Sequence, residues 1–343
     1  MHSPATNLKL LVRQFCVAGQ PRISPISRWA TLLTFALLAI GIVASVATQF
    51  TLESLPNIIL LVIGVVVLDV LSQLAPQVRV VQALQTVLYG VLYLVITCVC
   101  GVLAAYAMQR LAFPLQDRLL AGADRALGLN WADYAHWVDA HTLVQTVLRV
   151  AYNSIAAQIA LPVLIFAAAN QVRELREYLL AFVIAFSVTI VVSALMPAAG
   201  PIALVDRTTF DILRFTGATP IDHLTRLREA GRLVMTDFPG GIATFPSFHS
   251  TVAVLTPLTL RKHRIIFICL LVLDAAMLGG TVTEGAHYFV DVLAGTAMAF
   301  AGYALAKRII RAEDGNESIG RQADLDVNDE RRPEPQHPVL QKI

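Results

Sequence analysis

Eight blocks of mainly apolar residues follow one another along this chain, and most are long enough to cross a lipid bilayer. They lie at residues 29–50, 58–75, 84–108, 150–169, 178–196, 249–260, 265–283 and 287–306. A helix needs roughly 20 apolar residues to span hydrocarbon, so the short block at 249–260 would have to extend into its flanks or start below the interface. Because uninterrupted apolar blocks favour helices over barrel strands, the sequence predicts an all-α, polytopic membrane helix bundle with about eight transmembrane helices.

The composition agrees with a membrane protein and argues against several other classes. Only 15% of the 343 residues are charged, and the mean hydropathy is +0.65, whereas soluble domains carry about 25% charged residues. A net charge of +2 gives no indication of a nucleic-acid partner. The spacing of the cysteines predicts neither a disulfide framework nor a zinc site; they are Cys16, Cys98, Cys100 and Cys269. The first apolar block is long enough to remain as a span, so we expect no cleavable signal peptide.

Basic residues in the short loops predict the orientation of the helices. Lys and Arg are enriched in cytoplasmic loops, and the basic clusters here are Arg79, Arg173 with Arg176, Arg261–Arg264 and Lys307–Arg311. Placing them all in the cytoplasm puts both termini there as well. It also puts His249 and His287 together on the extracytoplasmic side, since two crossings separate them. We expect an integral protein of a bacterial inner (plasma) membrane.

The same reading divides the chain into four segments. They are a cytoplasmic N-terminal segment (1–28), N-terminal transmembrane helices (29–108), a core with two long outer loops (109–310) and a disordered cytoplasmic tail (311–343). The outer loop at 109–149 is amphipathic and carries Trp and Tyr, which suits a helix at the lipid–water boundary. The outer loop at 197–248 is broken by Pro and Gly and is long enough to cover a site.

Two histidine motifs carry the chemistry. Pro246-Ser247-Phe248-His249 opens one apolar segment, and His287 is followed four residues later by Asp291. On a helix, that spacing puts the imidazole and the carboxylate on one face. A carboxylate that binds one ring nitrogen fixes the tautomer and makes the other nitrogen a better nucleophile. Ionisable groups at membrane depth are costly and indicate a functional site.

These residues are suited to phosphoryl transfer without a cofactor. His287 would attack phosphorus and form a phosphohistidine, while His249 would protonate the departing alkoxide. Ser247, just before its helix, and the backbone N–H groups there would form an anion site. Each feature also has a structural interpretation: a His–Asp contact between helices, and a serine that only caps a helix.

The two motifs resemble the second and third signatures of the phosphatidic acid phosphatase type 2 superfamily, which comprises integral-membrane lipid phosphatases and phosphotransferases that work without metal. Phe-His after Pro-Ser and the run His287-Tyr288-Phe289-Val290-Asp291 are similar to the inositol phosphorylceramide synthase branch. The resemblance covers roughly residues 110–306 and implies a six-helix phosphatase-like core. It also implies His287 as nucleophile, Asp291 as its partner, His249 as general acid and Ser247 as a phosphate contact.

The first and third signatures depart from the family pattern. No Lys followed by six residues and Arg-Pro is present; Arg207 and Arg214 have the separation, but Phe215 follows. The arginine that normally stands six residues before the third-signature histidine is Thr281 here, next to Gly280. The phosphate charge must therefore be balanced elsewhere. We expect this from an arginine of the second outer loop, with Arg214 first and Arg207, Arg226, Arg228 and Arg232 as further candidates.

Several alternatives stay open. Glu284, three residues before His287, could tune the histidine, hold an acceptor hydroxyl or be a simple interfacial carboxylate. The predicted partner is a phosphorylated membrane lipid, with water or a lipid or polyol hydroxyl as acceptor. A metal-dependent hydrolase using His249, Glu284, His287 and Asp291 as ligands is a rival. A lipid transporter or flippase is another, although such folds tend to show broken helices and internal symmetry.

Overall fold

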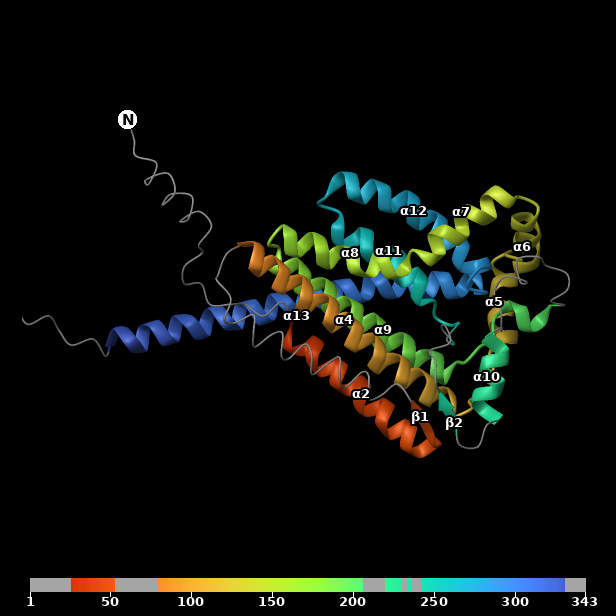
Figure 1. Cartoon of the computed structure of the whole chain (residues 1–343), viewed down its shortest axis with the longest axis horizontal. Helices are drawn as coiled ribbons and strands as arrows, with labels where there is room; N and C mark the ends of the chain where they lie inside the picture. The colour runs from red at the N-terminus through yellow and green to blue at the C-terminus, as the bar shows by residue number, and fades with distance from the viewer. Residues whose placement is uncertain are drawn as a thin grey trace, which may run out of the picture.

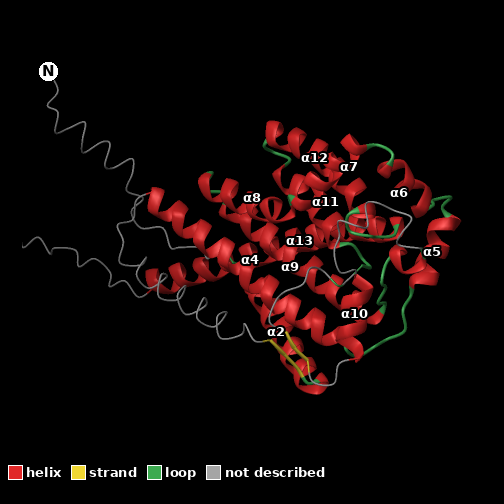
Figure 2. Cartoon of the chain, turned by 45° about the vertical axis from the view of Figure 1, so that its right-hand side comes forward, coloured by secondary structure: helices red, strands yellow, loops and turns green. Residues whose placement is uncertain are grey.

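The computed structural model describes residues 26–52, 79–205, 220–229, 233–235, 242 and 244–330. Helices make up almost all of this part of the chain (Figure 2). The exception is a short parallel pairing of β1 (Phe50–Leu52) with β2 (Leu233–Met235), in which Phe50 is opposite Leu233. The prediction of an all-α membrane bundle is confirmed.

Five of the described helices are long and apolar enough to cross a membrane. They are α2 (Arg28–Thr48), α4 (Arg79–Gln109), α9 (Val172–Leu195), α12 (Arg264–Thr283) and the first part, Phe289–Gly315, of α13 (Phe289–Glu330). The bent pair α7 (Thr142–Asn153) and α8 (Ile155–Ala168) would make a sixth span. Helix α13 continues past residue 311, where we predicted the start of the tail.

The structure changes two of the eight predicted spans, and a third lies outside the residues it describes. The block at 249–260 forms α11 (Phe248–Leu260), which has only 13 residues and is not extended into its flanks. The block at 150–169 is instead the end of α7 followed by α8, at an angle of 49°. Ser154 lies at this break, and its Oγ donates to the carbonyl of Ala151 at 2.6 Å, a contact of the kind that bends helices. The block at 58–75 lies outside the described residues.

The first predicted outer loop, residues 109–149, contains more structure than one interfacial helix. It forms α5 (Asp117–Ala126) and α6 (Trp131–Asp139), and α7 already begins at Thr142. In the second predicted loop the described elements are η1 (Pro201–Leu204), α10 (Pro220–Glu229) and β2. Figure 1 shows α5, α6 and α10 gathered at one end of the helix bundle.

The main hydrophobic core is built around α9. Its side chains Leu175, Leu179 and Phe182 are fully buried, and they belong to a cluster that draws residues from α2, α4, α8, α11 and α13. Helix α2 packs on α4, while α13 packs on α9 and α11 (Figure 1). Burial of these apolar side chains removes them from water and is the main force that holds the helices together.

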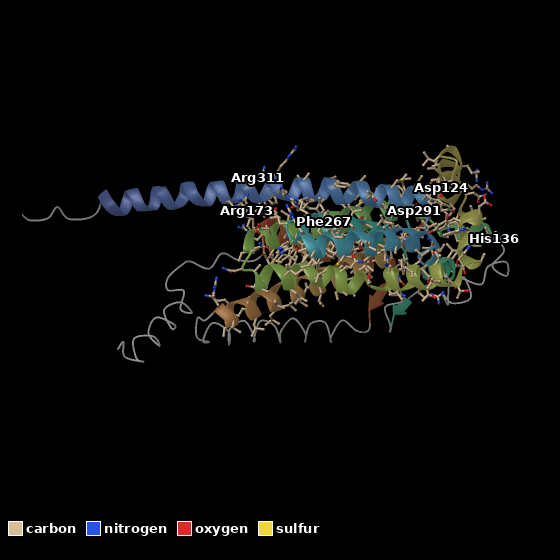
Figure 3. All side chains as sticks on the ribbon, turned by 90° about the horizontal axis from the view of Figure 1, so that it is seen from above. Asp124, His136, Arg173, Phe267, Asp291 and Arg311 are labelled. Carbon is tan, nitrogen blue, oxygen red and sulfur yellow. The ribbon has the colours of Figure 1, made fainter. Side chains whose placement is uncertain are left out.

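One end of the bundle is held by a buried ion-pair network. Arg176 of α9 contacts Glu313 at 2.8 Å and Asp314 at 3.0 Å, both on α13, and Ser27 donates to Glu313 at 2.9 Å. Figure 3 shows Arg173 and Arg311 toward this end and Asp124, Asp291 and His136 at the other. The predicted site residue Asp291 is therefore separated from the basic clusters by the length of the bundle.

At the other end, α11 and α13 approach so closely that their backbones touch. The N–H of Ser247 donates to the carbonyl of Asp291 at 3.1 Å, and Oγ1 of Thr251 donates to the carbonyl of Gly295 at 3.0 Å. A Cβ atom at Gly295 would lie 2.1 Å from the carbonyl oxygen of Ser247, a distance that no side chain tolerates. Glycine at this position is thus what lets the two motif-bearing helices meet.

We expect Gly295→Ala to destabilise the bundle, because the new methyl group must push α11 away from α13. Overpacking of this kind costs about 1–3 kcal/mol, which would appear as a lower midpoint of thermal unfolding in detergent. Gly302→Ala on the same helix is the matched control, since its Cβ would be 3.4 Å from the nearest atom, an ordinary contact. Equal midpoints for the two variants would contradict this account of the crossing.

Candidate active site

The two histidine motifs meet at the end of the bundle that carries α5 and α6. His287 lies in the short connection between α12 and α13, and Asp291 is in the first turn of α13. His249 is in the first turn of α11. The α11–α13 crossing therefore brings the Pro-Ser-Phe-His segment next to the His-Tyr-Phe-Val-Asp segment, although about 40 residues separate them in sequence.

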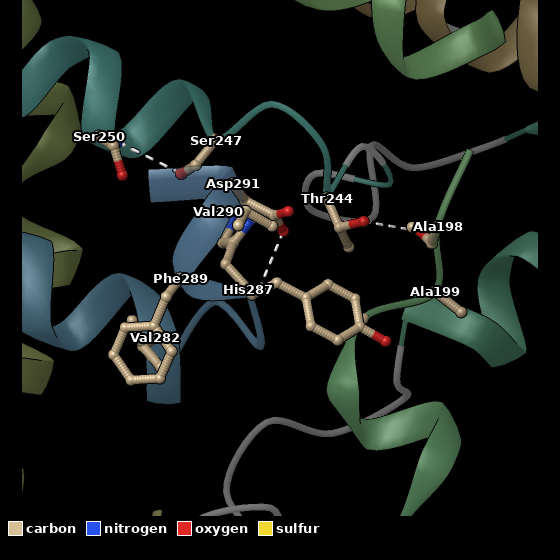
Figure 4. A network of polar contacts seen from close by, with 12 residues as sticks. Ala198, Ala199, Thr244, Ser247, Ser250, Val282, His287, Phe289, Val290 and Asp291 are labelled. Carbon is tan, nitrogen blue, oxygen red and sulfur yellow. Dashed lines mark hydrogen bonds and ion pairs between the residues drawn. The ribbon is translucent and has the colours of Figure 1, made fainter. Parts of the chain in front are cut away.

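His287 and Asp291 are in direct contact. Nδ1 of His287 lies 3.2 Å from Oδ2 of Asp291, as Figure 4 shows, and the same oxygen accepts the N–H of Tyr288 at 3.0 Å. The side chains are 6% and 0% exposed, so water competes little for this hydrogen bond. With Nδ1 donating to the carboxylate, Nε2 keeps its lone pair and is the nitrogen that can act as nucleophile.

His249 is held by an aromatic contact with Tyr152 of α7. The two rings are stacked, with centroids 4.0 Å apart and planes 9° from parallel. Tyr152 and His287 both lie close to Gly285: a Cβ built there would be 3.0 Å from Cε2 of Tyr152 and 2.7 Å from Cδ2 of His287. His249 and His287 are also close enough for their charges to interact. The three rings thus form one cluster.

Ser247 occupies a structural position in this cluster. It is fully buried, and its Oγ accepts the N–H of Ser250 at 3.3 Å, which caps α11 (Figure 4). This is the capping role that the sequence left open beside phosphate binding. A contact between Ser247 and phosphate stays a prediction.

Glu284 forms an ion pair that the sequence analysis missed. Its Oε2 lies 3.1 Å from Nε of Arg149 on α7. Burial raises the pKa of the Glu284 carboxyl, and the charge and hydrogen bond of Arg149 oppose this rise. Arg149 is the only charged residue of α7. A single charge in a helix that precedes an apolar helix indicates a functional residue, and this signal could have identified Arg149 from the sequence.

The arginines predicted to balance the phosphate charge are not placed at the histidine cluster by the structure. Arg207, Arg214 and Arg232 lie outside the described residues. Arg228 belongs to α10, a helix that packs against α4, and its neighbour Leu227 joins a hydrophobic cluster with residues of α4. Arg226 is on the same helix, and its side chain lies outside the described part of the structure. Among the described arginines, Arg149 pairs with Glu284, three residues before His287, and shares α7 with Tyr152, which stacks on His249.

Two buried carboxylates of α5 organise the start of α13, and the sequence analysis did not select either. Asp124 accepts the N–H groups of Phe289 at 3.0 Å and Val290 at 2.9 Å, and so caps α13 from another helix. Asp117 accepts the hydroxyl of Tyr288 at 3.0 Å. It also accepts the N–H of Gly200 at 2.8 Å, in the turn after α9. Their spacing of seven residues on one face of an amphipathic helix was the available signal.

The environment of these groups has electrostatic consequences. Burial raises the pKa of Asp124, and the hydrogen bonds from Phe289 and Val290 oppose the rise. Burial, together with the nearby Asp117 carboxylate, also raises the pKa of Tyr288, which keeps its phenol protonated as a donor.

In the described residues, no group of three or more His, Cys, Asp or Glu is placed to hold a metal ion. His249, Glu284, His287 and Asp291 are therefore not assembled there as a ligand set.

Asp124→Ala should loosen the first turn of α13, because two backbone N–H groups lose their acceptor inside a buried site. Loss of a helix cap costs about 1–2 kcal/mol. We therefore expect the amides of Phe289 and Val290 to exchange with deuterium roughly 5–30 times faster. Asp133→Ala, an exposed acid on α6, is the control and should leave these amides unchanged. Unchanged exchange in the Asp124 variant would rule out the cap.

Comparison with known proteins gives one match. The model of a family described as the PAP2 superfamily matches residues 118–305, more than half of the chain. This region begins in α5 and ends in α13, so it includes both histidine motifs, Arg149 and Asp124, while Asp117 stands one residue before it. No curated protein and no solved structure shows significant similarity to the chain.

Proposed function

This chain belongs to the PAP2 superfamily, and from that premise we propose that it is a membrane enzyme that moves the phosphoryl group of a lipid phosphoester through a phosphohistidine at His287. Membership of the family supports a phosphatase-type activity on a lipid phosphoester. The observation that carries the finer proposal is the buried hydrogen bond between His287 and Asp291, set beside a second histidine.

In the first step, Nε2 of His287 attacks phosphorus. A P–N bond forms and the P–O bond to the leaving alcohol breaks. The ring gains positive charge as it attacks, and the adjacent Asp291 carboxylate stabilises that charge while holding the ring in place. Because the site is buried, this electrostatic contribution is larger than it would be in water.

His249 supplies the proton that the leaving alkoxide needs. The charge of a bound phosphate favours the protonated form of a nearby imidazole, which offsets the cost of charging a buried ring. Stacking on Tyr152 fixes the plane of the His249 ring and so the direction of its N–H. In the second step the neutral His249 takes a proton from the incoming water or alcohol, whose oxygen attacks phosphorus and breaks the P–N bond.

Water as acceptor makes the protein a phosphatase, whereas a lipid or polyol hydroxyl makes it a phosphotransferase. The Phe-His pair after Pro-Ser and the run His-Tyr-Phe-Val-Asp resemble the inositol phosphorylceramide synthase branch. We therefore keep transfer of a phosphorylated headgroup between lipids as the alternative. For the membrane side, we propose that the site faces the extracytoplasmic leaflet and both termini the cytoplasm. Support comes from Arg173 and Arg311, which lie toward the end of the bundle opposite Asp291 (Figure 3).

Replacing either histidine should stop turnover of a labelled phospholipid by the purified protein. We expect His287→Ala to lose at least about a thousandfold in kcat, and Asp291→Asn roughly a hundred- to ten-thousandfold, because the ring loses its orienting carboxylate. His249→Ala should also be inactive. His136→Ala, an exposed histidine on α6, is the control. Thermal unfolding in detergent checks that each variant is folded.

Normal turnover in both histidine variants would contradict the mechanism. Movement of the phospholipid across vesicles by the protein, with no chemical change, would indicate the lipid transporter or flippase instead. Loss of turnover in excess chelator would favour the metal-dependent hydrolase.

The choice between water and an alcohol can be tested directly. The purified enzyme receives a labelled phospholipid with and without a hydroxylated lipid acceptor. A phosphotransferase should form a second labelled lipid only when the acceptor is present, because the phosphohistidine is then resolved by that hydroxyl. Release of inorganic phosphate alone, at the same rate in both samples, would eliminate the transferase version.

A further inference from the structure

The third signature of this chain lacks the cation that a phosphate site needs. Thr281 stands at that position; it is fully buried, and its hydroxyl donates to the carbonyl of Met277 at 2.8 Å. Its own carbonyl accepts the N–H of His287 at 3.4 Å. Thr281 therefore shapes the backbone of the site but brings no charge to it, whereas phosphate is bound most strongly by ionised donors.

The residue just before Thr281 allows another helix to reach the site. A Cβ atom at Gly280 would lie 2.6 Å from the carbonyl oxygen of Leu148 and 3.1 Å from its carbonyl carbon. These are backbone atoms of α7 and could not move aside without the helix. Glycine at 280 is thus the condition for α7 to pack directly on α12, at the level of the site.

This contact places Arg149, the next residue of α7, beside the histidines. Arg149 pairs with Glu284 at 3.1 Å, and Tyr152, one turn further along α7, stacks on His249. The side chain of Arg149 is 33% exposed, whereas that of Glu284 is 7% exposed. Arg149 is therefore the more exposed partner of the pair.

We propose that Arg149 binds the phosphate of the substrate, delivered by α7 in place of the arginine missing at position 281. The inference rests on the proposed function. A guanidinium presents its donors as a rigid fork that fits phosphate oxygens. Glu284 acts as a positioning residue that holds Arg149 at the site. The substrate class is therefore an anionic lipid phosphoester, recognised from α7 as well as from the two signature helices.

The test measures binding of inorganic phosphate to the full-length protein in detergent, by calorimetry, together with KM for the labelled phospholipid. Arg149→Gln should weaken phosphate binding roughly 10- to 100-fold and raise KM, since a charged hydrogen-bond donor is lost. Arg149→Lys should bind phosphate with intermediate affinity. Arg118→Gln, an exposed arginine of α5 at the same end of the molecule, should bind phosphate as the wild type does.

Variants of Glu284 separate phosphate binding from a purely structural ion pair. If the pair only joins α7 to α12, Glu284→Gln should be as damaging as Arg149→Gln, and the exchange of the two residues (Arg149→Glu with Glu284→Arg) should restore the protein. If Arg149 binds phosphate, Glu284→Gln should keep phosphate affinity within a few-fold and the exchange should not restore it. Should Arg149→Gln fail to fold, the same comparison uses Arg149→Lys.

Wild-type phosphate affinity in both Arg149 variants, or restoration by the exchange, would overturn the inference. Neither result would affect the proposed function, which is tested separately by the histidine variants. Loss of turnover in His287→Ala with unchanged phosphate affinity in Arg149→Gln would thus reject Arg149 alone.

Discussion

The site depends on the backbone contact between α11 and α13. Ser247 and Gly295 can approach only because no side chain stands between them, and that approach brings the start of α11 to the start of α13. Each histidine is within the first turn of its helix or just before it, so the position of the two rings follows from the position of two helix ends. Rings on rigid helix ends are held more precisely than rings on loops.

A helix that starts inside a protein leaves backbone N–H groups without partners, and these must be satisfied where water is excluded. For α13 the acceptor is the carboxylate of Asp124, from a separate helix that lies outside the apolar spans. Asp117 links the same region to the turn after α9 through Tyr288 and Gly200. Helix α5 therefore holds the start of α13 in place through hydrogen bonds. This explains why buried acids are found in a segment that the sequence predicts to be an interfacial loop.

The bent pair α7–α8 gives the site its remaining parts. Because the chain turns by 49° at Ser154, α7 can lie against α12 while α8 packs into the main core. One face of α7 then supplies Tyr152 to His249 and Arg149 to Glu284. The contact through Gly280 lets α7 bring Arg149 to Glu284, and in our proposal Arg149 takes the role of the arginine missing at position 281.

The sequence by itself determined the helical membrane architecture, most of the spans and the pairing of His287 with Asp291. The architecture and the spans follow from apolar length and helix-breaking residues. The pair follows from a spacing of four, although His287 stands just before α13 rather than on it. It also brought both histidines to one side of the membrane by counting crossings, although that side remains a prediction. The break at Ser154 was missed, because hydropathy reports how apolar a segment is and not whether it is one straight helix; the shortness of the 249–260 block was visible in the sequence, but whether it extends was not.

Only the tertiary structure decided the partners that come from other helices. The stacking of Tyr152 on His249, the pairing of Arg149 with Glu284 and the cap that Asp124 places on α13 join residues 97 to 166 positions apart. No periodicity encodes them, because each depends on how closely two helices approach, and that distance is decided by single atoms at Gly280 and Gly295. A sequence shows which side chains are available; the packing of whole helices decides which of them meet.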